Sequence, residues 1–474
     1  MLILSIETSC DETALALISM NENSNGEVSY TILDSIVHSQ AEMHAEYGGV
    51  FPTMAKREHI NNFPILLSQI IKNLQSVKND TLISKLEKDL DDQNSFNIEP
   101  AGKQSQEKEM YENLVKSLAG KFKINIDRIA VTSGPGLEPA LWVGIMYAEA
   151  LGKMWNVPVY PINHMEGHIL ASLMGNIEKN KETKLIEPNL PALALLISGG
   201  HTEMVLVTKN THPAKTNKFS NEKYKYEVIG HTIDDALGEA YDKVARMMGL
   251  PYPGGPHIAK LAQLKRENLG SKNENVADQN KISLPRPLLL NHNVKDANYL
   301  NFSFSGLKTA VLYALREHAP NQIAKETTIT STKDKIKSHS KEDANKEDIT
   351  SINTKSNLPI IEKSLAMNIS YEFENAITDV LKEKVKRAIE QKSANSLIIG
   401  GGVIANKYIR QEMQKLADEQ NILLFLPDNS LTGDNAIMIA CASYFIKQNE
   451  TKDFIYDNHH EKIIANGNMI LGQL

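Results

Sequence analysis

The sequence predicts an α/β fold made of two similar halves, and three observations lead to this prediction. Strand-like apolar runs alternate with helical segments along the chain, which is typical of α/β proteins. Residues 2–18 (LILSIETSCDETALALI) and 193–207 (LALLISGGHTEMVLV) both read as strand, tight polar turn and strand. The length agrees, because the 474 residues without their polar segments leave about 350, the size of two domains.

The expected strands are short apolar runs rich in β-branched side chains. They cover residues 2–7, 13–19, 28–38, 128–132, 157–161, 192–197, 203–208, 396–400 and 422–426. The expected helices have apolar side chains at three- and four-residue spacing, which makes one face of each helix apolar. They cover residues 54–75, 140–155, 163–175, 234–248, 256–264, 305–317, 361–391, 405–418 and 433–447.

Four polar segments interrupt this alternation, at about residues 76–118, 210–226, 265–282 and 320–358. Such stretches bury too little apolar area to offset the loss of chain entropy, so we expect surface insertions, and disorder at 320–358. The domain prediction places an N-terminal lobe at 1–190 and a C-terminal lobe at 191–433. A final helix and tail at 434–474 is expected to pack back on the N-terminal lobe.

Composition excludes several classes of protein. Lys and Arg number 51 against 58 Asp and Glu, a net charge of −7, which argues against a broadly basic nucleic-acid coat. Two cysteines form neither a disulfide framework nor a four-thiolate zinc site. No apolar run approaches the ~18 residues of a membrane span. The chain opens directly on a predicted strand, so we expect a bacterial cytoplasmic protein rather than a mitochondrial one.

The pair His164 and His168 is the first chemical signal. Residues four apart lie on one face of a helix, so both imidazoles could hold one metal ion. The alternative is two partly buried histidines with no ligand. Glu166 is not adjacent to His164, so the HExxH pattern of metallopeptidases is not met.

Three glycine-rich turns follow predicted strands, at residues 133–136, 198–200 and 400–402. Glycine lets backbone N–H groups approach phosphate or carboxylate oxygens, so the three turns together favour an anion-binding cleft. The alternative is that each glycine only makes a turn. None of the three matches GxxxxGK[ST] or GxGxxG, which argues against P-loop and Rossmann sites.

Acidic side chains gather at the start of two predicted helices. Asp235, Glu239 and Asp242 share one helical face, which could receive ligand hydroxyls or could be an ordinary solvated face. Asp434 stands at the start of the last long predicted helix, where it could cap the helix or supply an oxygen to a metal. No Ser-His-Asp or Cys-His set is evident, so a covalent acyl-enzyme is not expected.

Read together, these segments resemble the tRNA threonylcarbamoyladenosine transferase family in its bacterial and organellar form, TsaD. The resemblance spans Glu7 to Ala440, in family order, and leaves out only the polar insertions. The matching pieces are ETSCDETALAL, GGVFPTMAKREHI, TSGPGLEPALWVGI, NHMEGHI, LLISGGHTE, DDALGEAYDKVARMMGLPYPGGP, NFSFSGLKTAV, GGGVIAN and GDNAIMIA.

The resemblance implies a two-lobe fold of the actin-like, sugar-kinase-like (ASKHA) type. It implies transfer of a threonylcarbamoyl group from threonylcarbamoyl-AMP to N6 of the adenosine next to the anticodon, in tRNAs that read codons starting with A. One divalent metal ion per subunit is implied, with Fe²⁺ favoured and Zn²⁺ the alternative. The implied metal ligands are His164, His168 and Asp434. The implied substrate contacts are Leu196, Ile197, Ser198, Gly199, Gly200, Asp242, Gly255 and Asn406. Asp11 and Glu12 match the first phosphate-facing turn and are the candidate catalytic residues.

The implied partners are tRNA, a paralogous dimerisation partner (TsaB) and a small ATPase (TsaE), with no membrane. Three other functions stay open. A small-molecule kinase or ATPase on the same fold would not need paired histidines with Asp434. A metalloendopeptidase would need the missing HExxH glutamate, and a non-catalytic scaffold would not need metal ligands and a substrate loop.

Overall fold

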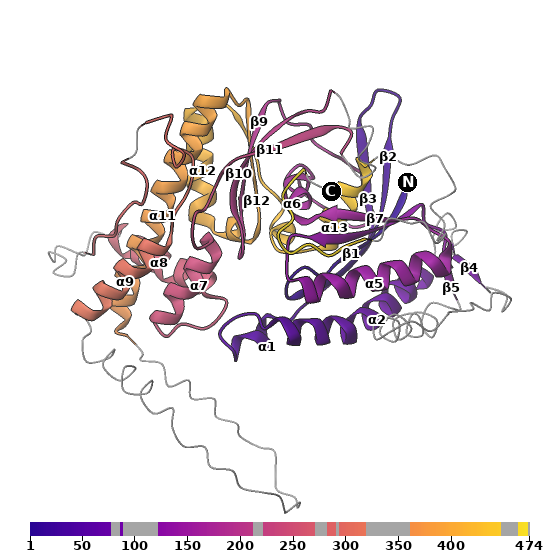
Figure 1. Ribbon diagram of the computed structural model, residues 1–474, viewed down its shortest axis with the longest axis horizontal. Helices are drawn as coiled ribbons and strands as arrows, with labels where there is room; N and C mark the ends of the chain where they lie inside the picture. Colours follow the sequence, from indigo (N-terminus) through magenta and orange to yellow (C-terminus); the bar gives the residue numbers. More distant parts are fainter. Residues whose placement is uncertain are drawn as a thin grey trace, which may run out of the picture.

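The computed structural model describes residues 1–76, 86–88, 122–211, 221–270, 282–290, 293–318, 361–446 and 463–472 (Figure 1). The polar segment 320–358 lies outside these ranges, so its expected disorder stays a prediction. The proposed divisions of the chain at residues 190 and 433 stay predictions as well. Among the described residues, no helix combines the length and hydrophobicity needed to cross a membrane.

The N-terminal half is built on a six-stranded sheet in the order β7-β6-β1-β2-β3-β8. The central strand β1 pairs antiparallel with β2 and parallel with β6, and β6 pairs parallel with β7. The strands are β1 (Leu2–Glu7), β2 (Glu12–Glu22), β3 (Val28–Ser39), β6 (Arg128–Gly134), β7 (Val159–Asn163) and β8 (Thr183–Lys184). A separate small sheet joins β4 (Leu86–Lys88) to β5 (Phe122–Ile124).

The C-terminal half repeats this plan in a five-stranded sheet, β11-β10-β9-β12-β13. Here β9 takes the place of β1, with β10 antiparallel on one side and β12 parallel on the other. The strands are β9 (Ala192–Ile197), β10 (Thr202–Lys209), β11 (Tyr224–His231), β12 (Ser396–Gly400) and β13 (Leu423–Phe425). The same order and the same strand directions in both halves confirm the predicted duplicated α/β core of the actin-like type.

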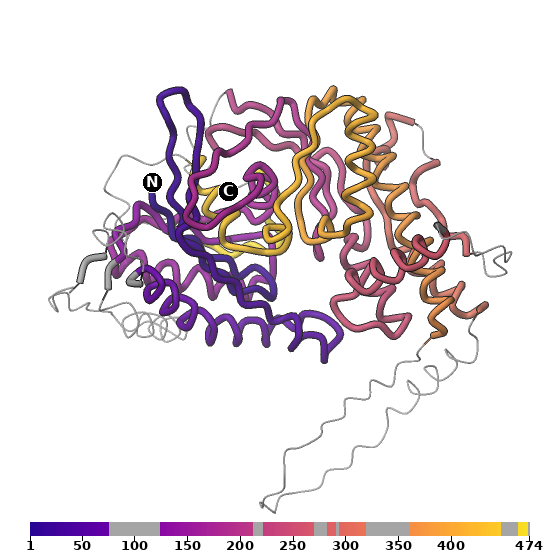
Figure 2. The backbone as a smooth tube through the Cα atoms, turned by 180° about the vertical axis from the view of Figure 1, so that it is seen from behind, coloured from indigo at the N-terminus to yellow at the C-terminus, as the bar shows by residue number. Residues whose placement is uncertain are grey.

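Helices cover both sheets and also fill the space between them (Figures 1 and 2). They are α1 (Ala41–Ala45), α2 (Pro52–Ser76), α5 (Glu138–Trp155), α6 (His164–Ala171), α7 (Leu237–Met247), α8 (Gly254–Gly270), α9 (Ser305–His318), α11 (Lys363–Lys392), α12 (Lys407–Glu419) and α13 (Ala436–Tyr444), with 3₁₀ turns η1 (Gly402–Ala405) and η2 (Asn429–Leu431). α2 and α5 cover the outer face of the first sheet, and α7, α8, α9 and α11 share an apolar core with the second.

The two helices between the sheets, α6 and α13, are the most buried. Every residue of α6 is buried, and so are the first eight of the nine residues of α13. Their side chains share one apolar cluster with residues of β1, β2, β9 and β10. This cluster joins the two halves, so the start of α6 and the start of α13 are held in fixed positions between the sheets.

Three predicted boundaries differ from the structure for clear physical reasons. The predicted insertion at 210–226 overlaps residues 224–226 of strand β11, which pair along β10 and bury Tyr224 and Tyr226 while Lys225 faces solvent. Helix α8 continues to Gly270, into the segment predicted as an insertion at 265–282. Helix α13 begins at residue 436 rather than 433, because the Asn435 side chain caps it by accepting from Met438 N at 3.0 Å.

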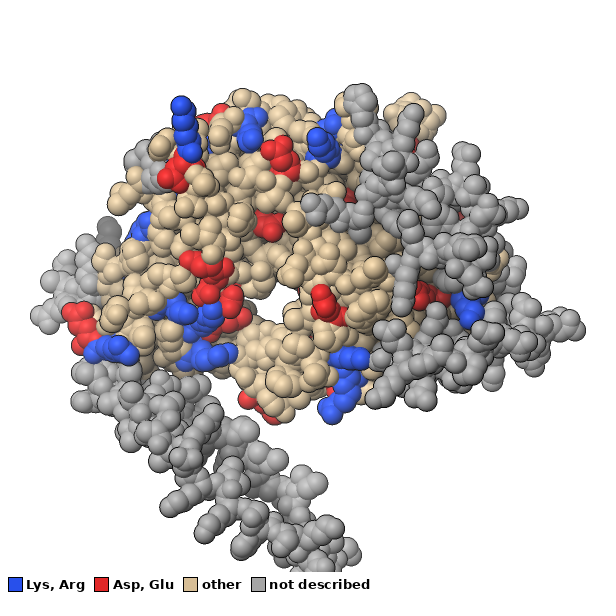
Figure 3. Space-filling view, in the orientation of Figure 1, with Lys and Arg blue, Asp and Glu red and all other residues tan. Residues whose placement is uncertain are grey.

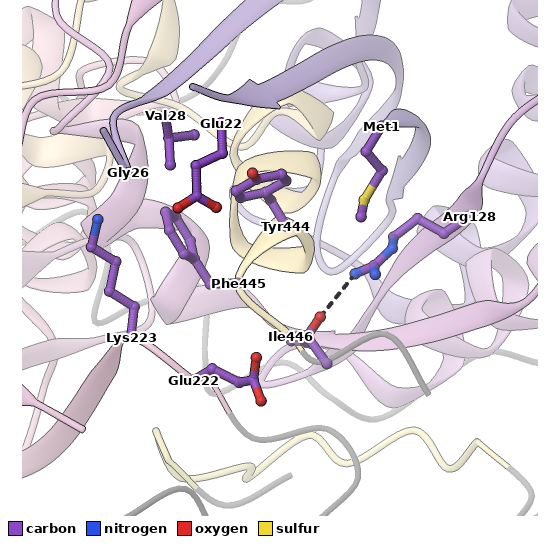
Figure 4. A pocket seen from close by; sticks show the side chains of 10 residues that line it. All are labelled: Met1, Glu22, Gly26, Val28, Arg128, Glu222, Lys223, Tyr444, Phe445 and Ile446. Atoms are coloured by element: carbon purple, nitrogen blue, oxygen red, sulfur yellow. Dashed lines mark hydrogen bonds between the residues drawn. The ribbon is translucent and has the colours of Figure 1, made fainter. Parts of the chain in front are cut away.

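The far end of α13 is held by a buried arginine (Figure 4). The Arg128 side chain is 1% exposed, and its Nη1 donates to the carbonyl oxygens of Ser443 and Ile446. Its guanidinium lies over the Tyr160 ring, 4.2 Å from the ring centroid. The last carbonyls of a helix have no partner within the helix, so Arg128 satisfies them and ties α13 to β6. Arg128 also lines a pocket of about 330 Å³ beside the end of α13.

We expect Arg128→Met to lower the free energy of unfolding by about 2–3 kcal/mol, because it leaves buried carbonyl oxygens without a donor. Urea unfolding measures the change. The matched control is Lys223→Met in the same pocket, where the half-exposed ammonium pairs with Glu187; we expect a loss below about 1 kcal/mol. Equal losses for the two variants would contradict the role given to Arg128.

Candidate functional site

Two histidines stand at the point where β7 passes directly into α6. The helix begins there because the Asn163 side chain accepts from Met165 N at 2.9 Å and from Glu166 N at 3.3 Å, which caps its free amides. His164 and His168 are buried, and their ring centroids lie 4.7 Å apart. The helical spacing therefore places both imidazoles on one side of α6, as the sequence predicts.

Asp434 reaches these histidines from the opposite end of the chain. Its Oδ1 lies 3.3 Å from His164 Nε2 and 3.2 Å from His168 Nε2. Burial alone would raise the pKa of Asp434, but the two imidazoles outweigh it and hold the pKa of this carboxyl well below its usual range. The packing of α13 against α6 thus brings together all three residues that the resemblance assigns to the metal.

This cluster fits a divalent cation. One ligand atom from each of the three residues can be chosen so that all three atoms lie within 4.8 Å of one another. Both ring nitrogens of His168 are buried, and Nδ1 has no hydrogen-bond partner among the described residues. Burial lowers the pKa of His168, so its ring is neutral and keeps a free lone pair. Imidazole nitrogens with one carboxylate are a ligand set that suits zinc or iron.

Two residues near this cluster were not singled out as site residues from the sequence. The Glu7 carboxylate lies 3.0 Å from His164 Nδ1. His201 follows the glycine turn of β9, and burial lowers its pKa to about 4, with His164 and His168 adding to the shift. His201 is therefore neutral at ordinary pH. The sequence contained a signal for Glu7 and for His201, since each lies in a segment that carries the family resemblance.

Asp11 lies on the turn between β1 and β2, and Glu12 is the first residue of β2. Burial raises the pKa of both carboxyls, and the charge of Asp434 adds to the rise. Burial and Asp11 also raise the pKa of the neighbouring Cys10 thiol well above its usual value. A protonated thiol is a poor nucleophile, which agrees with the expected absence of a covalent intermediate.

Of the three glycine turns, the one after β9 has open space in front of two adjacent glycines. Leu196 and Ile197 are buried in the strand, whereas Gly199 and Gly200 are exposed, and a Cβ at either glycine would meet no atom within 4 Å. The turn closes through Ser198 N, which donates to His201 O at 2.9 Å. A ligand could therefore lie directly against this backbone.

The same turn caps helix α7. Leu237 N donates to Thr202 Oγ1 at 2.9 Å, and the next two amides, of Gly238 and Glu239, donate to the carbonyls of Ser198 and Gly199. A Cβ at Gly238 would lie 2.7 Å from Ser198 O, so only glycine allows this contact. The carbonyls of the turn thus point into α7, which fixes the conformation of the turn.

At the other two glycine turns, the glycines allow other parts of the backbone to approach closely. A Cβ at Gly136 would lie 2.6 Å from Ser9 O, and one at Gly134 would lie 2.0 Å from Asn466 O. A Cβ at Gly400 would lie 2.7 Å from His168 O, and one at Gly401 would lie 2.4 Å from Ile197 O. At these four positions glycine permits close packing of backbone around the cluster.

Asp242 and Asn406, which the resemblance assigns to substrate, also have structural contacts. Asp242 Oδ1 accepts from Gly254 N at 2.7 Å, at the start of α8. The next residue, Gly255, has open space in front of it, since a Cβ there would meet no atom within 4 Å. Asn406 caps α12 by accepting from Tyr408 N at 2.9 Å. Burial raises the pKa of Asp242, and Asp11 adds to the rise, so the two acids lie near each other across the junction of the halves.

The remaining acids of the predicted ligand-binding face form ion pairs. Asp235 and Glu239 both pair with Lys243, at 2.7 and 2.8 Å. Asp234 instead caps α9, by accepting from Phe304 N at 2.8 Å. The space-filling view shows an opening between the halves with acidic and basic side chains on its rim (Figure 3). Of this helical face, Asp242 alone is left without a lysine partner among the described residues.

Comparisons with known proteins agree with the resemblance. The family model for TsaD, tRNA N6-adenosine threonylcarbamoyltransferase, matches residues 31–82 and 101–441. A curated relative of that name from Thermosipho africanus (strain TCF52B) is 33% identical over 446 residues, 94% of either chain. One from Bacillus subtilis (strain 168) is 33% identical over 444 residues, 93% of this chain and 89% of the relative. Among solved structures, the activator of the 2-hydroxyisocaproyl-CoA dehydratase from Clostridium difficile is 11% identical, with a TM-score of 0.37, over 94% of this chain and 93% of that one. The family match and these two relatives cover most of the chain, which therefore belongs to the tRNA N6-adenosine threonylcarbamoyltransferase family.

Proposed function

We propose that this protein transfers the threonylcarbamoyl group of threonylcarbamoyl-AMP to N6 of the adenosine next to the anticodon, in tRNAs that read codons starting with A. Membership of the family supports the reaction. The observation that carries the proposal is the convergence of His164, His168 and Asp434 between two halves of the chain.

The transfer is a substitution at a carbonyl carbon. The adenosine N6 attacks the carbamoyl carbon of the donor, the bond from that carbon to the phosphate oxygen breaks, and AMP leaves with the electron pair. N6 loses one proton. Because the donor is a mixed anhydride with a good leaving group, the protein has mainly to position a weak amine against it.

We propose that the reaction depends on one divalent cation per subunit, Fe²⁺ in preference to Zn²⁺. His164, His168 and Asp434 would hold it, which leaves coordination positions for water or donor oxygens. A bound cation would orient the donor and polarise its oxygens.

The turn Leu196–Gly200 is proposed to bind the donor, together with Asp242, Gly255 and Asn406. The exposed backbone of Gly199 and Gly200 can approach the donor closely, and backbone amides there would stabilise negative charge on the carbonyl oxygen. Asp11 and Glu12 are the candidates for the base that takes the N6 proton. Their raised pKa values suit this task, because a stronger base accepts a proton more readily.

The proposed partners are tRNA, a paralogue of the TsaB type and an ATPase of the TsaE type, and the proposed location is the bacterial cytoplasm. With a net charge of −7, the protein would bind tRNA through local basic groups. Lys243 and Lys308 both lie near Asp235, at 2.7 and 3.7 Å, and are partly neutralised by it. Arg57 on α2 also forms an ion pair, with Glu58 at 3.3 Å, but its side chain is 69% exposed, so it is a further candidate for a phosphate contact.

Mass spectrometry of nucleosides tests the reaction. We expect tRNA incubated with the protein, its partner proteins and preformed threonylcarbamoyl-AMP to gain threonylcarbamoyladenosine, and tRNA with the target adenosine replaced by guanosine to gain none. Consumption of ATP with phosphorylation of a small molecule, and no modified nucleoside, would support the kinase alternative instead.

The metal proposal predicts the behaviour of ligand variants. His164→Ala and His168→Ala are expected to bind no cation and to lose transfer by about 10³-fold, the scale of several kcal/mol of transition-state stabilisation. Asp434→Asn should lose less metal, because an amide oxygen still coordinates weakly. Metal analysis and single-turnover transfer measure both effects, with His231→Ala at an exposed histidine as the control. A double His164→Ala/His168→Ala variant that transfers at the wild-type rate would refute the metal dependence.

The contact between α7 and the turn predicts a second effect. Gly238→Ala places a Cβ 2.7 Å from both Ser198 O and Gly199 Cα, so the turn must move. We expect kcat/KM for the donor to fall by about 10–100-fold, the effect of a misplacement near 1 Å. Gly306→Ala is the matched control, since a Cβ there meets no atom within 4 Å. Wild-type kinetics for Gly238→Ala would show that the turn does not position the donor.

A further inference from the structure

We infer that Glu7 is a positioning residue for His164, because its carboxylate keeps the ring proton on Nδ1 and so turns the Nε2 lone pair toward Asp434 and a bound cation. This inference rests on the proposed cation site. Glu7 touches neither the donor nor the ligand atoms, and it acts only through the imidazole.

Glu7 is rigidly placed. It is the last residue of β1, which is hydrogen-bonded to β2 on one side and to β6 on the other. Its side chain is completely buried. Oε1 accepts from Ser9 N at 2.5 Å, and Oε2 accepts from Thr132 Oγ1 at 2.5 Å. These contacts fix the carboxylate independently of the histidine.

The contact with His164 sets the position of its proton. Glu7 Oε2 lies 3.0 Å from His164 Nδ1, and the ring nitrogen is buried with it. An ionised carboxylate accepts hydrogen bonds and cannot donate them, so the proton of this contact belongs to Nδ1. Burial lowers the pKa of His164, but the charges of Asp434 and Glu7 outweigh it and raise the pKa well above its usual value, so the metal-free ring also carries a proton on Nε2. Loss of that proton, which binding of a cation requires, leaves a lone pair on Nε2.

That lone pair faces acceptors. His164 Nε2 lies 3.3 Å from Asp434 Oδ1, and His168 Nε2 lies 3.2 Å from the same oxygen. In the metal-free protein the Nε2 proton of His164 lies against Asp434 Oδ1, and once it is lost the electron pairs of three side chains converge. A cation can bind all three, so the tautomer imposed by Glu7 is the one that the cation needs.

The other histidine has no such support. His168 Nδ1 has no hydrogen-bond partner among the described residues, although it is buried. His168 is held instead by the packing of α6. The helix backbone lies so close to Gly400 that a Cβ at Gly400 would be 2.7 Å from His168 O. The effect of Glu7 should therefore appear at His164 and leave His168 unchanged.

The test compares Glu7→Gln with the wild type. The glutamine amide has the shape of the carboxylate but can donate a hydrogen bond. If the amide oxygen accepts from Ser9 N, as Oε1 of Glu7 does, the amide NH₂ points to His164 Nδ1. Nδ1 must then accept, which favours the tautomer with the proton on Nε2. Long-range ¹H–¹⁵N spectra of the metal-free, histidine-labelled protein report the tautomer. At a pH above the raised pKa of His164, where the ring is neutral, we expect Nδ1–H at His164 in the wild type and Nε2–H in the variant.

Affinity for Zn²⁺ or Fe²⁺, measured by competition with a chelator, is the second readout. We expect Glu7→Gln to lower it by about 10–100-fold, the usual effect of removing the carboxylate behind a metal-binding histidine. Glu166→Gln is the matched control. Glu166 is a buried carboxylate on α6 that bonds to Asn221 and Tyr226 rather than to the histidines, so its loss should leave affinity and tautomer unchanged.

An unchanged His164 tautomer together with an affinity within twofold of the wild type would overturn the inference. If Glu7→Gln does not fold, Glu7→Asp keeps the charge but shortens the side chain by one methylene, and an unchanged affinity there would overturn it equally. A wild-type protein that binds no cation would refute the proposed metal dependence, while the tautomer in the metal-free protein would still decide the role of Glu7.

Discussion

The site depends on one contact, that of the Asp434 carboxylate with the imidazoles of His164 and His168, at 3.3 and 3.2 Å. The two histidines belong to α6 in the N-terminal half, whereas Asp434 follows the whole C-terminal half in the sequence. The contact exists because α13 returns to pack against α6, β1 and β2 in the apolar cluster between the sheets. Arg128 fixes the end of the same helix. Thus the burial of two short helices, rather than local sequence, sets the geometry of the three proposed ligands.

Close backbone packing then brings the turn Leu196–Gly200, which is proposed to bind the donor and is called the donor turn here, to this cluster. Gly401 lets the end of β12 approach Ile197 O, and Gly400 lets it approach His168 O, so the glycine turn after β12 touches both the donor turn and α6. Gly238 locks the donor turn on α7 from the other side. A chain that must place a carbonyl donor against a weak nucleophile gains most from such rigid placement. The paired histidines of a metallopeptidase would need a glutamate beside them, and Glu166 points instead to Asn221.

The sequence predicted what local patterns encode. The strand, turn and strand of residues 2–18 and 193–207 became the cores of the two sheets, and the i, i+4 spacing placed His164 and His168 on one side of α6. Other features have no local pattern. Strand β11 begins by alternating buried Tyr224 and Tyr226 with exposed charged residues, so its first three residues were included in the predicted insertion. Glu7 lies inside an apolar strand, and only the tertiary approach of α6 reveals its partner. Asp434 was assigned through the resemblance, since spacing along the chain does not connect it to the histidines.

The measurement that tests the central claim most directly is removal and return of the cation in one preparation of the unaltered protein. After chelation and dialysis, we expect the protein to remain folded, because its three apolar clusters contain no metal ligand. We expect it to lose threonylcarbamoyl transfer to tRNA and to regain it as Fe²⁺ or Zn²⁺ is added, with saturation at one equivalent per chain. Full transfer by the metal-free protein, in the presence of excess chelator, would contradict the account.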